Sequence, residues 1–184
     1  MKVRRITRSA KGFTLIETMI ALAVMAIGVL GLAGMLADSL AYMNGSQADF
    51  IAEQKAQQAV EAIFTAKYSS SITWAQVANN SVGNPLGLFF STPQPILQPG
   101  PDGLVNSIND TGAPADYILY PGPDGKLGTA DDVKVPLSNY TRTITITPSF
   151  GGDANLSQIT VTVNYTVGRF TRKYTLNTLI SAFD

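Results

Sequence analysis

One long apolar segment near the N-terminus constrains this chain more than any other feature. Residues 13–37 read FTLIETMIALAVMAIGVLGLAGMLA, and Glu17 is the only charged residue among them. The 20 residues from Thr18 to Ala37 carry no charge. A helix of about 20 residues, rising about 1.5 Å per residue, spans a hydrocarbon core about 30 Å thick. We therefore expect a membrane-spanning or fibre-core helix over residues 13–37.

A short basic leader, residues 1–12, precedes this segment. It contains no acid and five bases, Lys2, Arg4, Arg5, Arg8 and Lys11. The positive-inside rule places such a flank in the cytoplasm, which leaves the rest of the chain on the other side of the membrane. A conventional secretory signal also has a basic start and an apolar run, and the small residues Ala37 and Ser39 follow here. Composition alone leaves that alternative open.

Composition excludes several classes of function. The 184 residues include 13 basic and 13 acidic side chains but no His and no Cys. Disulfides and thiol catalysis are therefore absent, and so is the commonest general base and metal ligand. Without the five leader bases, 8 basic residues face 13 acidic ones, so the chain has no electrostatic reason to bind nucleic acid. We expect no enzyme and no nucleic-acid partner; an oxygen-ligand site for a hard cation remains open.

Periodicity divides the rest of the chain. Apolar residues at helical spacing continue among polar ones over residues 38–68, and no Pro occurs before Pro85, which predicts one helix from about Phe13 to about Lys67. Residues 139–184 contain β-branched runs of period two, typical of half-buried strands with turns at Gly151-Gly152 and Gly168-Arg169. The predicted fold class is α+β, with the long helix packed on a C-terminal antiparallel β-meander.

Residues 69–138 are rich in Ser, Asn, Pro and Gly and predict a long loop region that packs on the folded head. Within it we expect a short helical turn around Trp74 and a short strand over Tyr117–Tyr120. Its apolar residues are the predicted anchors, namely Leu86, Leu88, Phe89, Phe90, Ile96 and Leu97.

The stretch Lys11–Glu17, KGFTLIE, followed by an apolar run resembles the prepilin signature of type IV pilins and type II secretion pseudopilins. The run AIGVLGLAGM and the ending RKYTLNTLIS look most like minor pilins of the PilV type. The resemblance implies that a membrane prepilin peptidase cuts between Gly12 and Phe13 and methylates the new Phe13 amine. It also implies a head in the periplasm, an inner-membrane assembly platform, and a filament built with other pilin subunits around a bundle of such helices.

Glu17 stands alone in an apolar helix, where an ionised carboxylate costs a few kcal/mol unless it has a cationic partner. Phe13 lies four residues earlier, about one helical turn away, so the mature Phe13 amine is within reach. In the family this carboxylate pairs with the Phe13 amine of a neighbouring subunit and checks register during assembly. The alternative is an interfacial carboxylate that reaches headgroup water.

Three glycines, Gly28, Gly31 and Gly34, interrupt the apolar helix at three-residue spacing. Helix glycines cost about 1 kcal/mol each relative to Ala in water, and in membranes small residues permit close helix contact. Family members loosen this part of the helix in filaments, usually near a Pro, which this chain lacks. We hypothesise a soft point at these glycines; a small-residue packing face is the equal alternative.

Two segments share the sequence PGPDG, Pro99–Asp110 and Pro121–Asp132. Calcium binds six to eight oxygens from flexible loops with turn glycines. The second segment offers Asp124, Thr129, Asp131 and Asp132, and some pseudopilins carry calcium in a loop ahead of their last strands. We therefore predict a calcium site there; the alternative is a solvated turn, because Pro-Asp-Gly forms turns without a metal. The spacing is not that of an EF-hand.

The remaining features are weaker. A basic cluster, Arg169, Arg172 and Lys173, lies near the last strand and is interpreted as either a solvated face or a subunit contact. The leading hypothesis for function is a structural minor pilin that primes or joins a type IV filament. The alternatives are a minor pseudopilin of a type II secretion system and a membrane-anchored periplasmic binding module whose helix never enters a filament.

Overall fold

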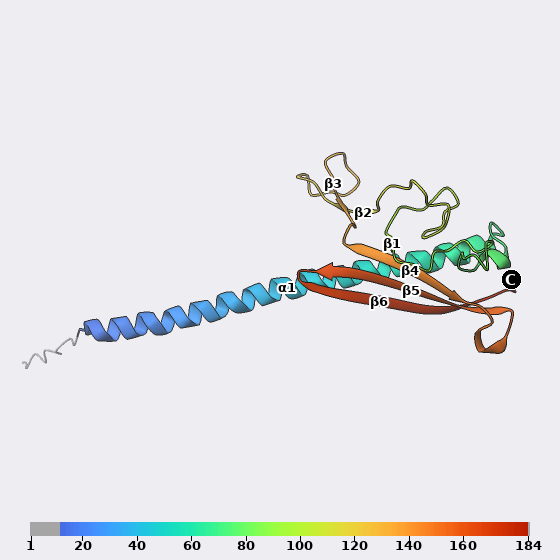
Figure 1. Cartoon of the computed structure of the whole chain (residues 1–184). Helices are drawn as coiled ribbons and strands as arrows, with labels where there is room; N and C mark the ends of the chain where they lie inside the picture. Colours follow the sequence, from blue (N-terminus) through green and yellow to red (C-terminus); the bar gives the residue numbers. More distant parts are fainter. Residues whose placement is uncertain (1–11, 184) are drawn as a thin grey trace, which may run out of the picture. The chain divides into compact units, whose positions relative to one another are not determined.

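The structure, a computed structural model, describes residues 12–183 (Figure 1). The chain separates into two compact units, Met1–Met43 and Asn44–Asp184. The predicted leader, apart from Gly12, lies outside the described residues. One helix, α1, runs from Leu15 to Tyr68 and contributes to both units. It begins two residues after the predicted start and ends one residue after the predicted end.

In the first unit, α1 holds the apolar segment. Residues 12–40 are all exposed, including Leu22, Ile27 and Leu30 at 65%, 72% and 72%. By length and composition, α1 is one helix that can cross a membrane. An apolar helix that buries none of its surface within its own unit needs lipid or other chains around it.

The second unit is built on a four-stranded antiparallel sheet in the order β1-β4-β5-β6. Its strands are β1 (Gln94–Pro95), β4 (Tyr140–Thr147), β5 (Leu156–Val167) and β6 (Phe170–Ser181). Alternate residues of the long strands point into the core; Ile144, Ile159 and Val161 are all fully buried. The period-two pattern therefore predicted β4, β5 and β6 correctly, and the meander of the sequence is confirmed.

The second half of α1 packs on the sheet through an alanine face. Ala52, Ala56 and Ala59 are fully buried, and Ala48 and Ala66 nearly so. These residues recur at intervals of three, four and seven, so they lie on one side of the helix. Small side chains bring the helix backbone close to the sheet, and Ile63 on the same face adds the larger apolar contact.

Residues 69–138 lie mainly above the helix and the sheet in the view of Figure 1, where they are drawn in green and yellow. They contain the short 3-10 helix η1 (Trp74–Gln76) and a separate hairpin of β2 (Tyr117–Tyr120) and β3 (Val133–Pro136). The helical turn and the Tyr117–Tyr120 strand are confirmed, whereas β1 and β3 were not predicted. Among the anchors, Leu88, Phe89 and Ile96 are buried, but Leu86 is 62% exposed and that prediction is wrong. Leu86 and the preceding Pro85 form an exposed turn, which points the leucine side chain to solvent.

Buried Arg142 of β4 ties the loop region to the helix. Its Nε donates to Asn106 Oδ1 at 3.0 Å, and its Nη1 donates to the Lys55 carbonyl of α1 at 3.1 Å. Asn106 Nδ2 donates back to the Arg142 carbonyl at 2.7 Å. Burial lowers the pKa of Arg142 to about 10, so its guanidinium stays charged at neutral pH. One network thus fixes helix, sheet and loop together.

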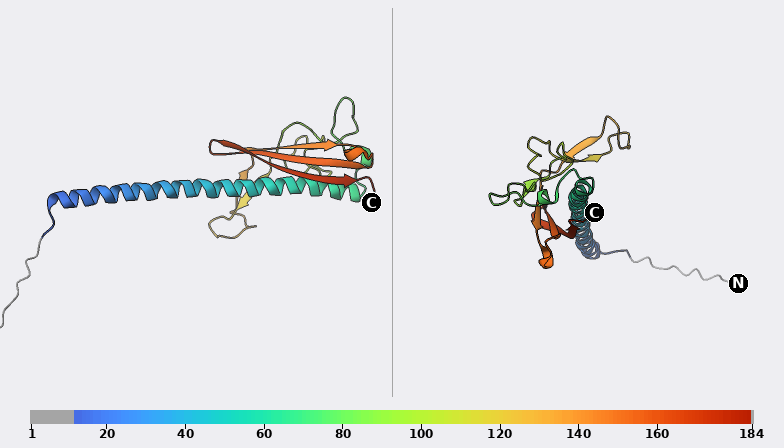
Figure 2. Two further views of the ribbon diagram at one scale, coloured as in Figure 1. Left: turned by 90° about the horizontal axis from the view of Figure 1, so that it is seen from below. Right: turned by 90° about the vertical axis from the view of Figure 1, so that its right-hand side faces the viewer.

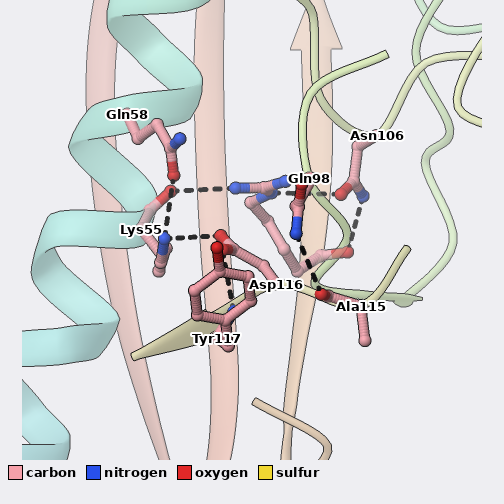
Figure 3. A network of polar contacts seen from close by, with 8 residues as sticks. Lys55, Gln58, Gln98, Asn106, Ala115, Asp116 and Tyr117 are labelled. Carbon is pink, nitrogen blue, oxygen red and sulfur yellow. Dashed lines mark hydrogen bonds and ion pairs between the residues drawn. The ribbon is translucent and has the colours of Figure 1, made fainter. Parts of the chain in front are cut away.

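The hairpin joins the same network through Asp116, the residue before β2 (Figure 3). Lys55 Nζ forms an ion pair with Asp116 Oδ2 and also donates to Gln58 Oε1 at 3.3 Å. The other Asp116 oxygen accepts from the Tyr117 amide at 2.8 Å. A single carboxylate therefore anchors the start of the hairpin to the side of α1.

A second polar cluster joins β5 and β6 to α1. Tyr165 donates its hydroxyl to Asp49 Oδ1 at 2.6 Å, and Arg172 Nη1 lies 3.1 Å from both Asp49 oxygens. The Tyr165 hydrogen bond, helped by Arg172, holds the pKa of Asp49 below its usual value. Burial, with the Asp49 contact, raises the pKa of Tyr165 to about 12.

Short 3-10 helix η2 (Phe150–Gly152) connects β4 to β5, and a turn at Gly168 connects β5 to β6. Both turns lie where the sequence predicted them. Gly168 has φ +59°, a backbone conformation that glycine adopts at little cost.

Candidate assembly site at the N-terminus of the helix

Thr14 and Glu17 form a capping box at the start of α1. The Glu17 amide donates to Thr14 Oγ1 at 3.3 Å, and the Thr14 amide lies 3.5 Å from Glu17 Oε2. The two side chains thus satisfy amides that a helix leaves without intrahelical partners, and the carboxylate lies at the positive end of the helix dipole. The sequence TLIE carries this T-x-x-E signal, which our sequence analysis missed.

The predicted processing position is open on all sides. Phe13 is 82% exposed, and a Cβ added to Gly12 meets nothing within 4 Å. The peptide bond between them precedes the first helical residue, so its backbone is outside the helix. An exposed bond outside the helix leaves its amide and carbonyl available to a peptidase, because a helical backbone already uses its own amides and carbonyls.

Phe13 is joined to Gly12 in this chain and has no free amine, so the predicted pairing of that amine with Glu17 is untested. The capping box nevertheless shows where the Glu17 side chain points. It folds back toward the residues that precede the helix rather than along the helix. A cation at the N-terminus of a processed chain would meet the carboxylate on that side.

Gly28, Gly31 and Gly34 lie within regular helix, and a Cβ at any of them has nothing within 4 Å. The isolated chain therefore shows neither a break nor a packed partner at the glycines. The soft point and the packing face both concern the helix in a bundle, and both stay predictions.

The second PGPDG segment gathers its predicted ligands around one hydroxyl. Thr129 Oγ1 lies 2.7 Å from Asp131 Oδ1, 3.4 Å from Asp132 Oδ1 and 3.5 Å from Asp124 Oδ1. The hydrogen bond from the Thr129 hydroxyl to Asp131 Oδ1 lowers the pKa of Asp131. The carboxylates also accept from backbone amides, for example Gly128 to Asp132 Oδ2 at 2.6 Å. Within residues 12–183 no group of three or more carboxylates is placed to hold a metal ion, so calcium stays a prediction.

The first PGPDG segment is built differently. Asp110 is 6% exposed and accepts from the Ser107 amide at 3.0 Å and the Ser107 hydroxyl at 3.1 Å. Burial raises the pKa of Asp110. This aspartate closes a turn inside the folded unit, which is a structural role.

Comparison with known protein families gives one match. Residues 7–33 match the prokaryotic N-terminal methylation motif. The match covers the predicted cleavage position, Glu17 and most of the apolar segment, and it indicates a protein of the type IV pilin-like or pseudopilin kind. Together with the single apolar helix, it fits a protein anchored in the inner membrane. Comparisons with curated proteins and with solved structures gave no match.

Proposed function

We propose that the chain is a structural minor pilin, cut by a prepilin peptidase between Gly12 and Phe13, which primes or joins a type IV filament through α1. The observation that carries the proposal is the methylation motif over residues 7–33, placed on a helix whose apolar half buries nothing in its own unit. Such a half-helix suits the lipid bilayer, where the chain waits before assembly, and also a bundle of like helices in the filament.

The fold of the second unit supports a structural role. Its core joins helix and sheet, and its buried polar side chains, Arg142 and Asn106, bond to each other and to backbone.

Substitution of Glu17 tests the proposal. We expect the Glu17→Ala chain to insert into the membrane and to keep its folded head. Its amount in filaments should fall at least about tenfold relative to the parent chain, because the Phe13 amine of the neighbouring subunit loses its partner in an apolar bundle. The measurement is the amount of chain in sheared filaments relative to the amount in the membrane.

Two matched variants sharpen this experiment. Glu61→Ala removes an exposed carboxylate from the same helix and should assemble normally. Thr14→Ala removes the capping box and should assemble better than Glu17→Ala. Normal assembly of Glu17→Ala would contradict the proposal and favour a membrane-anchored binding module.

A minor pseudopilin of a type II secretion system is the second candidate. The observation that favours it is the aspartate-rich connection 121–132, which lies between β2 and β3 and ahead of the long strands β4–β6. Affinity purification of the membrane-embedded chain separates the two, since the partners are pilus subunits in one case and secretion-system components in the other.

A further inference from the structure

The hairpin β2–β3 exposes apolar side chains that the described residues, 12–183, leave uncovered. Val133 and Val135 are 54% and 43% exposed, and Leu119 is 39% exposed. Two-stranded hairpins are marginally stable alone, so their apolar side chains usually gain stability from a partner surface. Beside the hairpin, Phe50 of α1 is 58% exposed.

Between the hairpin and α1 lies a depression of about 380 Å³, which we call the hairpin groove. Its walls are mainly apolar, formed by Phe50 and Ile51 of α1 and by Tyr117, Ile118 and Leu119 of β2. The groove lies within the second unit, and the polar residues Gln47, Gln54 and Lys55, the last of which is paired with Asp116, also line it. Its volume and lining suit an aromatic side chain.

A second surface of the same unit offers such a side chain. At the turn between β5 and β6, Phe170 is 73% exposed and is flanked by exposed Arg169 and Lys173. Within the described residues neither base is in an ion pair, whereas Arg172 is bound to Asp49. We call Arg169, Phe170 and Lys173 the aromatic turn.

The hairpin and the aromatic turn flank the same stretch of α1 from different sides. Gln47 Nε2 donates to the hydroxyl of Tyr120 at 2.8 Å, whereas Asp49 binds Arg172 next to the turn. Residues two apart on a helix point about 200° away from each other. Figure 2 agrees, with the hairpin below α1 and the β5–β6 turn above it in the left view.

The two surfaces also have opposite charge. The connection between β2 and β3 carries Asp124, Asp131 and Asp132 against one base, Lys126. The aromatic turn carries two bases and no acid. Two copies of the same surface repel each other, so a two-fold contact that pairs hairpin with hairpin or turn with turn is disfavoured. A second copy placed beside the first in the same orientation can instead bring its basic aromatic turn to the acidic connection.

We propose that the hairpin groove receives Phe170 from a second copy of this chain, with Arg169 and Lys173 beside the acidic connection 121–132 of the receiving copy. An aromatic side chain in a pocket with a neighbouring arginine is the usual centre of a protein interface. The contact joins two different surfaces, so the first copy keeps a free aromatic turn and the second keeps a free groove. Further copies can therefore add at both ends, and the contact propagates instead of closing into a dimer. The inference rests on the proposed function, because the apolar half-helix is what brings copies side by side.

The absence of Cys permits a clean crosslinking test. Two tagged full-length chains of different size, one with Gln54→Cys among the groove-lining residues and one with Thr171→Cys beside Phe170, are expressed together and oxidised in the cell envelope, so that Phe170 and the apolar groove walls stay in place. A disulfide forms only where Cα atoms approach within about 7 Å. We expect about tenfold more mixed dimer than from a control pair in which Val82→Cys replaces the groove cysteine, because Val82 is fully exposed and is not among the groove-lining residues.

Charge reversal adds the second readout. Arg169→Glu in the Thr171→Cys chain should lower the mixed dimer severalfold, and Asp131→Lys in the Gln54→Cys chain should restore it. Mixed dimer no greater than in the Val82 pair, indifference to charge reversal, or crosslinks only to another subunit would each overturn the inference. If the chain is still processed at Phe13 and assembled in those cells, the proposed function survives that failure.

Discussion

At the scale of single residues, Glu17 has one partner in the structure, Thr14, and we propose a second, the Phe13 amine, after processing. In the chain before processing it caps its own helix together with Thr14, which explains why a carboxylate is tolerated at the first turn. After the proposed cleavage the Phe13 amine appears on the side toward which the carboxylate already points. The cap thus holds the side chain ready for the charge that cleavage creates.

Tyr165 gives a pH dependence at this scale. Its pKa rises from 10.0 to about 12 on folding, so its contribution to stability is fully present below pH 10 and is lost as pH rises to about 12. We predict that the free energy of unfolding of the full chain in detergent falls over this interval, and that Tyr165→Phe makes the fall shallower.

Tyr68→Phe, at a tyrosine that is 54% exposed, is the control and should keep the slope of the parent chain. Equal slopes for the parent and Tyr165→Phe would show that the Asp49 cluster does not hold the proton on Tyr165.

At the scale of elements, the alanine face decides how α1 meets the sheet. Ala56 is fully buried, so a larger side chain has no room without moving the helix. We predict that Ala56→Leu lowers the free energy of unfolding by about 1–3 kcal/mol. Gln57→Leu, at the exposed neighbouring position, should change it by less than about 0.5 kcal/mol. Equal effects in denaturant titrations would mean that helix and sheet are not closely packed.

The connection 121–132 carries the calcium prediction. If its carboxylates bind the ion, the melting temperature in calcium exceeds that in EDTA, and Asp131→Asn, which removes one ligand charge, abolishes the difference. Asp110→Asn in the first PGPDG segment is the comparison and should leave the calcium effect in place. An identical melt in calcium and EDTA would leave the segment as a turn held by Thr129 and backbone amides.

The sequence predicted elements with a strong local pattern and missed those without one. Twenty residues without charge specify a helix, and Ile, Val and Thr at period two specify β4–β6. In contrast, β1 is two residues long and ends in Pro95, and β3 is an exposed VKVP segment, so neither buries a periodic face. Both strands exist because a partner strand is nearby, which is tertiary information.

Site residues divided in the same way. Gly12, Phe13 and Glu17 belong to a contiguous motif that the sequence shows directly, and their roles in processing and assembly stay predictions. Arg142 looked like an ordinary strand residue, although it is 1% exposed and binds Asn106 and the Lys55 carbonyl. Its importance comes from residues 36 and 87 positions away in sequence, a separation that no short motif encodes.

At the scale of the whole molecule, we assign the two units different tasks. Among the described residues of its own unit the apolar half-helix has no partner, so we propose that it serves lipid or other copies, whereas the second unit is stabilised by its own core. The proposed groove and aromatic turn would add a contact between folded units of neighbouring copies. Both rest on one claim, that the helix stays attached to the head after processing.

Mass spectrometry of the mature N-terminus tests that claim most directly. We expect a chain that begins at Phe13, carries a methyl group on its N-terminal amine, and keeps the apolar segment joined to the folded head. A chain that begins after about residue 37 would contradict it, because the segment would then be a discarded export signal.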